Sequence, residues 1–269
     1  MTGRPTSRGA NLMAHLPWPA YAERISNGAV VLIPVGALEQ HGRHLPLGVD
    51  YMLAEAVALQ TAEHVDAVVA PPFVYGYKSQ LRTGGGPQFP GTVGLDGHSL
   101  SSAMTDVLRG LARGGVKRLA IVDGHYENQM FLTEACDLAI REFRQSGQDG
   151  VKIVQARYFE QFDEAILERH VGDPPLDLAY EHAGIFETSL FLHLFGDLVD
   201  MDVAPRQAFK EFPSYDCHPP HDDWVPATGA LSDPHRASAA LGREVFDACV
   251  EGMVRILEHE FSPEGDRKT

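Results

Sequence analysis

The sequence predicts a single-domain α/β/α sandwich with a mostly parallel sheet. Apolar runs of strand length alternate along the chain with segments of helical length and periodicity. The connections between successive runs are long enough for right-handed βαβ crossovers. Two of the runs, at 30–33 and 119–122, lead directly into polar loops. Open α/β sheets present their sites in this way, at the carboxyl ends of the strands.

The first elements follow from apolarity and from helix signals. Residues 18–25 are expected to form a short helix that packs its aromatic side chains beside the first strand. Residues 29–35 form that strand, and their unbroken apolarity indicates burial on both faces. Asp50 stands where a helix at 51–64 opens, and it suits the N-cap position of that helix. A short strand at 67–70 ends at two prolines.

A glycine- and proline-rich loop then occupies residues 75–96, and a loop of this length in a compact domain is usually functional. The remaining elements are expected to be a helix at 98–114, a strand at 118–122, a helix at 128–146, a strand at 151–156, helical segments at 159–170 and 181–195 with PPLD at 174–177 between them, an irregular stretch at 203–230 and a closing helix at 235–260. The domain is expected to span 15–262, between a flexible N-terminal tail at 1–14 and a C-terminal tail at 263–269.

Composition narrows the classes of partner. The chain has 269 residues and is 44% hydrophobic, which is enough for the core of an ordinary globular domain. Lysine and arginine number 22 against 37 acidic residues, a formal charge of -15. Nucleic acids and anionic membranes require a basic face, so neither is expected as a partner. The acidic surplus ordinarily serves solubility, but part of it is available as metal-binding carboxylate.

The cysteines and the apolar runs bear on the compartment. Cys136, Cys217 and Cys249 are spaced neither as a zinc knuckle nor as a disulfide framework, so we expect a reducing cytoplasm. The N-terminal residues contain no apolar core of a signal peptide. No run of about 18 apolar residues occurs, so no membrane span is expected.

Two strand ends carry the residues that bind divalent metals. Glu39, His41 and Asp50 follow the first strand, and His125 and Glu127 follow the strand at 118–122. In an extended loop, residues two apart project the same way, so each Glu/His pair can reach into one cavity. Asp50 is the natural carboxylate to bridge two ions. Two ions about 3.5–4 Å apart can share a hydroxide and polarise a carbonyl, which suits hydrolysis of an amide, above all a cyclic one.

Each of these residues also has an ordinary structural interpretation. A single histidine is more often a satisfied polar residue than a ligand. Glu39 could cap a helix, Glu127 could stabilise the first turn of the next helix, and Asp50 could be only an N-cap. The joint pattern favours a metal site, because both pairs follow strand ends.

Longer motifs connect the chain with a known family. The stretch PVGALEQHGRHLPLGVD at 34–50 resembles the signature of the creatininase family of amidohydrolases. The similarity continues through YGYKSQ at 75–80, GGGPQFPGT at 84–92, DGHYEN at 123–128 and EHAGIFETS at 181–189. The HYEN and YKSQ forms are similar to those of creatininase proper, the branch of the family that interconverts creatinine and creatine.

The resemblance implies a metal-dependent hydrolase of a cyclic amide, most simply creatinine to creatine in a reversible reaction, with two divalent ions, typically zinc and manganese. Carried over by position, Glu39, Asp50 and His125 hold one metal, while His41, Asp50 and Glu127 hold the other. His182 matches the catalytic histidine that handles the proton of the ring nitrogen, and Glu127 is counted with it as catalytic. The family also implies a homohexamer.

The substrate pocket departs from the family pattern. The resemblance places Ser79, Tyr126 and Glu181 as substrate contacts. Creatininase closes its pocket with tryptophans, but residues 150–182 contain none. The candidates for their place are Tyr158, Phe159 and Tyr180, with Leu178 about where the second tryptophan would lie. A related lactam or another cyclic amide is therefore an alternative substrate.

Three further alternatives remain open at this stage. A formamide hydrolase acting on a phosphorylated intermediate would need basic residues near the metals, and only Lys78, Arg82 and Arg43 are candidates. A non-catalytic metal-stabilised scaffold is a second alternative, but it would have no use for His182. His182 itself could instead be structural, with its side chain bonded to a backbone carbonyl in a helix. Glu187 either orients a ligand imidazole or packs as a buried polar group.

Overall fold

The computed structural model describes residues 11–171, 181–206 and 212–262, and it confirms the α/β/α sandwich. Its sheet has four strands in the order β2-β1-β3-β4, and all neighbouring pairs are parallel. The strands are β1 (Val30–Val35), β2 (Ala67–Val69), β3 (Arg118–Asp123) and β4 (Lys152–Arg157). Leu32 pairs with Val69 on one side and with Ala120 on the other, so β1 lies inside the sheet.

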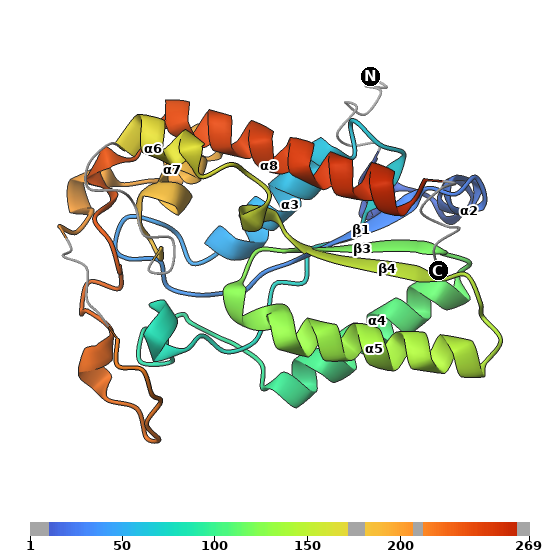
Figure 1. The fold of residues 1–269 in the computed structure, drawn as a ribbon, viewed down its shortest axis with the longest axis horizontal. Helices are drawn as coiled ribbons and strands as arrows, with labels where there is room; N and C mark the ends of the chain where they lie inside the picture. The colour runs from blue at the N-terminus through green and yellow to red at the C-terminus, as the bar shows by residue number, and fades with distance from the viewer. Residues whose placement is uncertain (1–10, 172–180, 207–211, 263–269) are drawn as a thin grey trace.

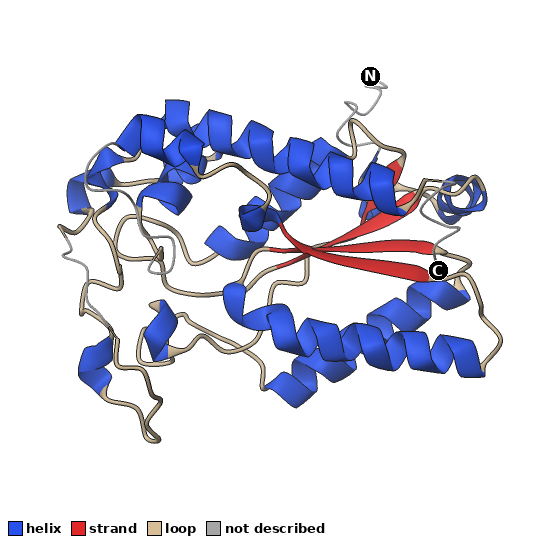
Figure 2. Cartoon of the chain, in the orientation of Figure 1, coloured by secondary structure: helices blue, strands red, loops and turns tan. Residues whose placement is uncertain are grey.

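Helices cover both faces of the sheet (Figures 1 and 2). The α-helices are α2 (Trp18–Ser26), α3 (Val49–Thr61), α4 (Gly97–Arg113), α5 (Gln129–Gln145), α6 (Ala165–Val171), α7 (Ile185–Leu194) and α8 (Ala239–Glu260). Alternate residues of β1 point to opposite faces: Leu32 packs in the core beneath α3, α7 and α8, and Ile33 packs in the core above α4 and α5. All six residues of β1 are buried, as its apolar sequence predicts.

Most predicted elements agree with the structure to within a few residues, but three details were wrong. Asp50 is not an N-cap, because α3 begins at Val49 after Gly48. The stretch 159–170 is not one helix: a 3₁₀ turn at Tyr158–Glu160 precedes α6. The segment that begins at 181 is helical only from Ile185.

The third correction matters because it changes the setting of His182. This histidine precedes α7 instead of lying inside it, and the next residue, Ala183, has a left-handed backbone with φ of 53°. Glu181 takes the place of a capping residue, since its Oε1 accepts a hydrogen bond of 2.7 Å from the Phe186 backbone.

The chain ends are only partly described. Asn11, which the sequence places in the N-terminal tail, donates to the carbonyl of Ala62, and Leu12 forms a bridge with Val69. The PPLD stretch at 174–177 lies outside the described residues. Among the residues that are described, no helix has the length and apolarity needed to cross a membrane.

Candidate metal centre and pocket

The loops after β1 and β3 meet at the carboxyl edge of the sheet, close to the start of α3. Gly36 allows this approach, because a Cβ at that position would lie 2.3 Å from the backbone nitrogen of Tyr51. Gly124 does the same for the other loop, since its Cβ would lie 2.4 Å from the carbonyl oxygen of Asp50. Backbone packing of this kind needs glycine, and it brings Asp50 between the two loops.

One group of ligand atoms surrounds His125. Its Nδ1 lies 3.0 Å from Oδ2 of Asp50 and 3.2 Å from Oε2 of Glu39. Its Nε2 lies 3.0 Å from the carbonyl oxygen of Tyr77, to which it donates a hydrogen. That bond fixes the tautomer and leaves Nδ1 as the ligand atom, directed at the two carboxylates.

A second group surrounds His41 and shares the same aspartate. Nε2 of His41 lies 3.1 Å from Oδ1 of Asp50 and 3.5 Å from Oε1 of Glu187. Nδ1 of His41 lies 3.1 Å from the carbonyl oxygen of Glu39 and donates to it, so Nε2 is the ligand atom. Asp50 therefore directs one oxygen at each imidazole.

These atoms fit metal ions better than they fit one another. Nε2 of His41 and Oδ2 of Asp50 are buried, and neither makes a hydrogen bond within the described part of the chain. Donors about 2.1 Å from a tetrahedral zinc ion lie about 3.4 Å from each other. The separations of 3.0 to 3.5 Å in the two groups are close to that spacing.

The charges lead to the same conclusion. Burial lowers the pKa of His41, but the carboxylates of Glu187 and Asp50 outweigh it and hold that pKa well above its ordinary value. The pKa of His125 is likewise raised well above the ordinary value by its carboxylates, against the effect of burial. The cluster thus demands positive charge, which divalent cations would supply in place of protons.

Glu127 lies beside the first group and apart from the second. Its Oε2 is 3.4 Å from Nε2 of His125, and its Oε1 accepts hydrogen bonds from the Gln80 backbone and the Thr83 hydroxyl. The described residues place Glu187, not Glu127, with His41 and Asp50. Sequence reasoning left the role of Glu187 open, because its distance from the other ligands along the chain hides their contact.

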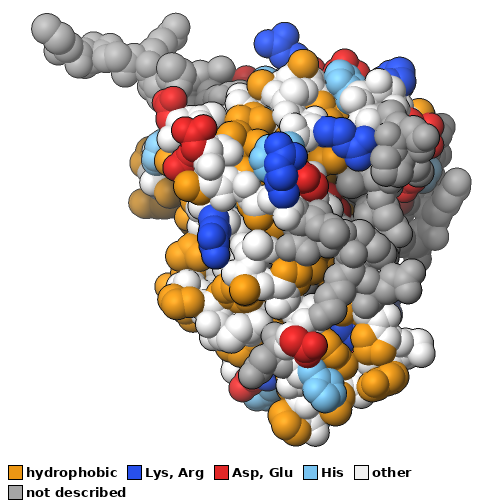
Figure 3. Space-filling view, turned by 90° about the vertical axis from the view of Figure 1, so that its left-hand side faces the viewer, with side chains coloured by type: hydrophobic (Ala, Val, Ile, Leu, Met, Phe, Trp, Pro, Cys, Tyr) orange, Lys and Arg blue, Asp and Glu red, His pale blue; other side chains and the backbone are white. Residues whose placement is uncertain are grey.

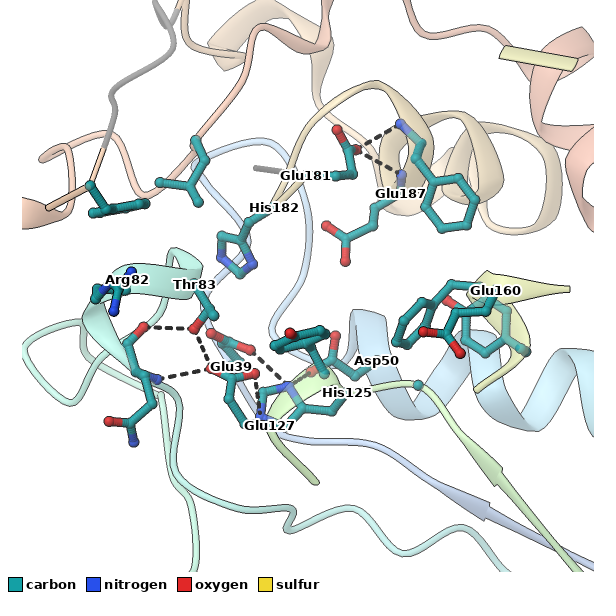
Figure 4. Close-up of a pocket in the computed structure, with 18 of the residues that line it drawn as sticks. Glu39, Asp50, Arg82, Thr83, His125, Glu127, Glu160, Glu181, His182 and Glu187 are labelled. Atoms are coloured by element: carbon teal, nitrogen blue, oxygen red, sulfur yellow. Dashed lines mark hydrogen bonds and ion pairs between the residues drawn. The ribbon is translucent and has the colours of Figure 1, made fainter. Parts of the chain in front are cut away.

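His182 projects over the same cluster from the opposite wall (Figure 4). It is 5% exposed, and its ring centroid lies 4.5 Å from that of His41. A ring nitrogen of His182 also lies close enough to Glu39 and His41 to share an ion with them. Its backbone is held by a hydrogen bond from Leu231 to its carbonyl oxygen.

A cavity of about 850 Å³ opens above these groups. Its wall beside β4 and α7 is aromatic: Phe162 and Phe186 stack at 5.3 Å, and Tyr158 meets Phe159 edge-on at 5.6 Å. The opposite wall carries Arg82, the single lysine or arginine that lines the cavity in the described part of the chain. Figure 3 shows the end of the molecule at which the strands terminate, where acidic and basic side chains of the described residues are interspersed.

The predicted substrate contacts differ in their position relative to the cavity. Tyr126, Tyr158 and Glu181 line the cavity. Ser79 is 5% exposed and lies behind the lining, against the position where a Cβ on Gly85 would fall. Leu178, like Tyr180, lies outside the described residues.

Phe162, Phe186 and Phe212 also line the cavity and were not predicted. The sequence could have indicated Phe186, because it lies within the EHAGIFETS motif at 181–189. Burial and the neighbouring Glu187 raise the pKa of Glu181 to about 8, against the hydrogen bonds that it accepts.

Fold and site together define a protein of the metal-dependent hydrolase class. Residues 14–257 match the family model Creatininase, described as creatinine amidohydrolase, and the chain belongs to this family. It is 42% identical to the creatinine amidohydrolase of Pseudomonas putida, over 93% of this chain and 97% of that protein. It is 32% identical to a mycofactocin precursor peptide peptidase of Mycolicibacterium smegmatis, over 83% and 82% of the two chains.

Solved structures of creatininase share the fold. A mutant creatininase complexed with creatine is 41% identical and superposes with a TM-score of 0.91, over 94% of this chain and 99% of that chain. A Zn-Zn form of a mutant gives the same identity and TM-score, over 94% and 98% of the two chains. A manganese form of creatininase also matches with 41% identity and a TM-score of 0.91, over 94% and 99%.

Proposed function

We propose that this chain hydrolyses a cyclic amide with two divalent metal ions, and that creatinine, converted reversibly to creatine, is its substrate. The observation that carries the proposal is the sharing of Asp50 between His41 and His125. The 42% identity to a creatinine amidohydrolase and the likeness to a creatine complex support the choice of substrate.

The geometry supports two ligand sets. Glu39, Asp50 and His125 would hold one ion, and His41, Asp50 and Glu187 would hold the other. The zinc and manganese forms of related creatininases support these two metals for this chain. When bound, the ions would polarise the amide carbonyl and lower the pKa of water.

The protein's own residues would orient the metal ligands and transfer the proton. Hydrogen bonds to the carbonyl groups of Tyr77 and Glu39 hold His125 and His41 with the correct nitrogen toward the ions. His182 lies at the cavity wall above them and would pass a proton to the ring nitrogen as the amide bond breaks.

The aromatic wall would cover a planar ring and exclude water from it. Tyr126 lies at the open side of the cavity, where it is 60% exposed, and Tyr158 is buried at its base. A small flat amide has few polar groups, so aromatic contact would provide much of its affinity.

Glu127 would act through its neighbours. Its carboxylate ties the Gln80 and Thr83 segment to His125, so it would orient that imidazole and hold the glycine-rich loop at the cavity. Metal binding by Glu127, as the family resemblance implies, would require its carboxylate to move toward His41.

A bulkier lactam is the second candidate substrate. The cavity of about 850 Å³ has room for more than one small ring. A phosphorylated formamide is less well supported, because Lys78 pairs with Asp96 and Arg82 pairs with Asp216. These pairs leave little positive charge for a phosphate.

We also propose a homohexamer in the cytoplasm. The family resemblance supports the assembly, and exposed apolar side chains such as Trp18, 80% exposed, are available for subunit contacts. The three cysteines are free thiols, which suits a reducing compartment. Light scattering coupled to size exclusion would measure the assembly: six subunits are expected, and a monomer would contradict it.

Turnover by metal-reconstituted protein tests the function. Protein stripped with a chelator should be inactive, and addition of Zn²⁺ or Mn²⁺ should restore formation of creatine from creatinine. Larger N-substituted lactams, assayed in parallel, would identify the alternative. Protein that binds two metal equivalents but opens no cyclic amide would overturn the proposal.

A further inference from the structure

Gln40 lies between two proposed metal ligands in the chain, and its side chain contacts His182. It is 5% exposed and joins three loops. Its Nε2 donates to the carbonyl oxygens of Gly84, at 2.6 Å, and Gly229, at 2.8 Å. Its Oε1 accepts a hydrogen bond of 3.0 Å from the Gly42 backbone. All hydrogens of the amide are thereby used, and its orientation is fixed.

The backbone of Gln40 contacts the catalytic candidate directly. Nε2 of His182 lies 2.9 Å from the carbonyl oxygen of Gln40 and 2.9 Å from its side-chain nitrogen. The amide nitrogen has no third hydrogen to donate, so the imidazole nitrogen must itself be the donor, to the carbonyl oxygen. The hydrogen of the neutral ring is then on Nε2, and Nδ1 keeps its lone pair.

The surrounding backbone is shaped for this arrangement. A Cβ on Gly84 would lie 2.4 Å from the ring of His182, and a Cβ on Gly229 would lie 1.9 Å from Oε1 of Gln40. Both glycines have positive φ, 97° and 75°. Only glycine permits the two loops to close on the ring and on the amide at these distances.

We propose that Gln40 is a positioning residue that fixes the orientation and the tautomer of His182, and so makes Nδ1 the nitrogen that takes up the proton. The amide holds the Gln40 carbonyl in place against His182 through the loops at Gly84 and Gly229, and it does not touch the substrate. The kinetic consequence rests on the proposed function, whereas the tautomer is a property of the protein alone.

The tautomer can be measured without any substrate. Solid-state ¹⁵N NMR of zinc-loaded protein labelled at histidine distinguishes the two nitrogens, and the signal absent from His182→Ala identifies the residue. We expect hydrogen on Nε2. Hydrogen on Nδ1 of the neutral ring would overturn the proposal, whether or not the protein hydrolyses creatinine.

The near-isosteric variant Gln40→Met tests the action of the amide. The amide ties the Gln40 segment to the loops at Gly84 and Gly229, so without it the Gln40 carbonyl that accepts from His182 loses its fixed position. We therefore expect a mixture of tautomers, two retained metal equivalents, and a fall in kcat of roughly 10- to 100-fold with KM changed less than about 3-fold, because the acid–base group is misplaced. Gln155→Met is the matched control: Gln155 also donates to a backbone carbonyl, that of Gln129, but it lies on β4 away from the cavity lining. It should match wild type in all readouts.

Two outcomes for Gln40→Met would contradict the proposal. An unchanged tautomer with unchanged kcat would show that the backbone alone holds His182. Loss of metal would show that Gln40 acts through its neighbours Glu39 and His41. If the variant does not fold, the wild-type NMR measurement still decides the tautomer.

Discussion

Oδ2 of Asp50 lies 3.0 Å from Nδ1 of His125, on the opposite side of the carboxylate from His41. Helix α3 begins at Val49, one residue before Asp50. The Asp50 side chain therefore leaves the first turn of the helix toward the carboxyl edge of the sheet. Two loops and one helix start therefore meet at one carboxylate, which is 3% exposed.

The first prediction separates the two glutamates. Glu187→Gln should reduce the metal content from two equivalents to about one, because Glu187 is the second carboxylate beside His41. Glu127→Gln should retain both ions, since its contacts are with His125, Gln80 and Thr83. Elemental analysis of the two variants makes the comparison. The reverse result would favour the assignment taken from the family resemblance.

The second prediction concerns His182. His182→Ala should keep two metal equivalents while kcat falls by roughly 10²–10⁴-fold, the usual effect of losing a general acid–base group. Elemental analysis and initial rates with creatinine provide both readouts. Loss of one ion would instead make His182 a ligand with Glu39 and His41, with which its ring nitrogen is grouped.

The sequence predicted the fold and most of the cluster for identifiable physical reasons. Unbroken apolar runs marked buried parallel strands, and polar residues after 35 and 123 marked the carboxyl edge. Glu187 could not be assigned, because its contact with His41 depends on how α7 packs against the loop after β1. The start of α7 was also missed, since the apolar stretch after His182 continues the helical pattern backward through Ala183.

The third prediction concerns the aromatic wall. Phe159→Ala should raise KM and lower kcat for creatinine with unchanged metal content, because the ring loses a contact that excludes water. Phe159→Trp should narrow the cavity and shift kcat/KM toward creatinine and away from N-substituted lactams. Rates for both substrates with metal-loaded protein test this. An unchanged ratio in the tryptophan variant would show that Phe159 does not set ring size.

The fourth prediction concerns buried thiols and pH. Burial raises the pKa of Cys136 and of Cys249 to about 12, so at pH 8 only about 0.01% of each is the reactive thiolate. Iodoacetamide should leave the buried Cys249 unmodified between pH 7 and 9 in the folded protein and label it after unfolding. Because the folded pKa exceeds the ordinary value of 9.0, these thiols should lower stability as pH rises from about 9 toward 12. Rapid labelling of Cys249 in the native state would contradict its burial.

The shared aspartate is the central claim, and the metal content of Asp50→Ala tests it most directly. His41→Ala is the comparison, because it removes a ligand from one proposed site only. Elemental analysis after dialysis should find two equivalents in wild type, about one in His41→Ala, and in Asp50→Ala either none or one weakly held ion. Two full equivalents in Asp50→Ala would contradict the bridging role of this residue and with it the account of the site.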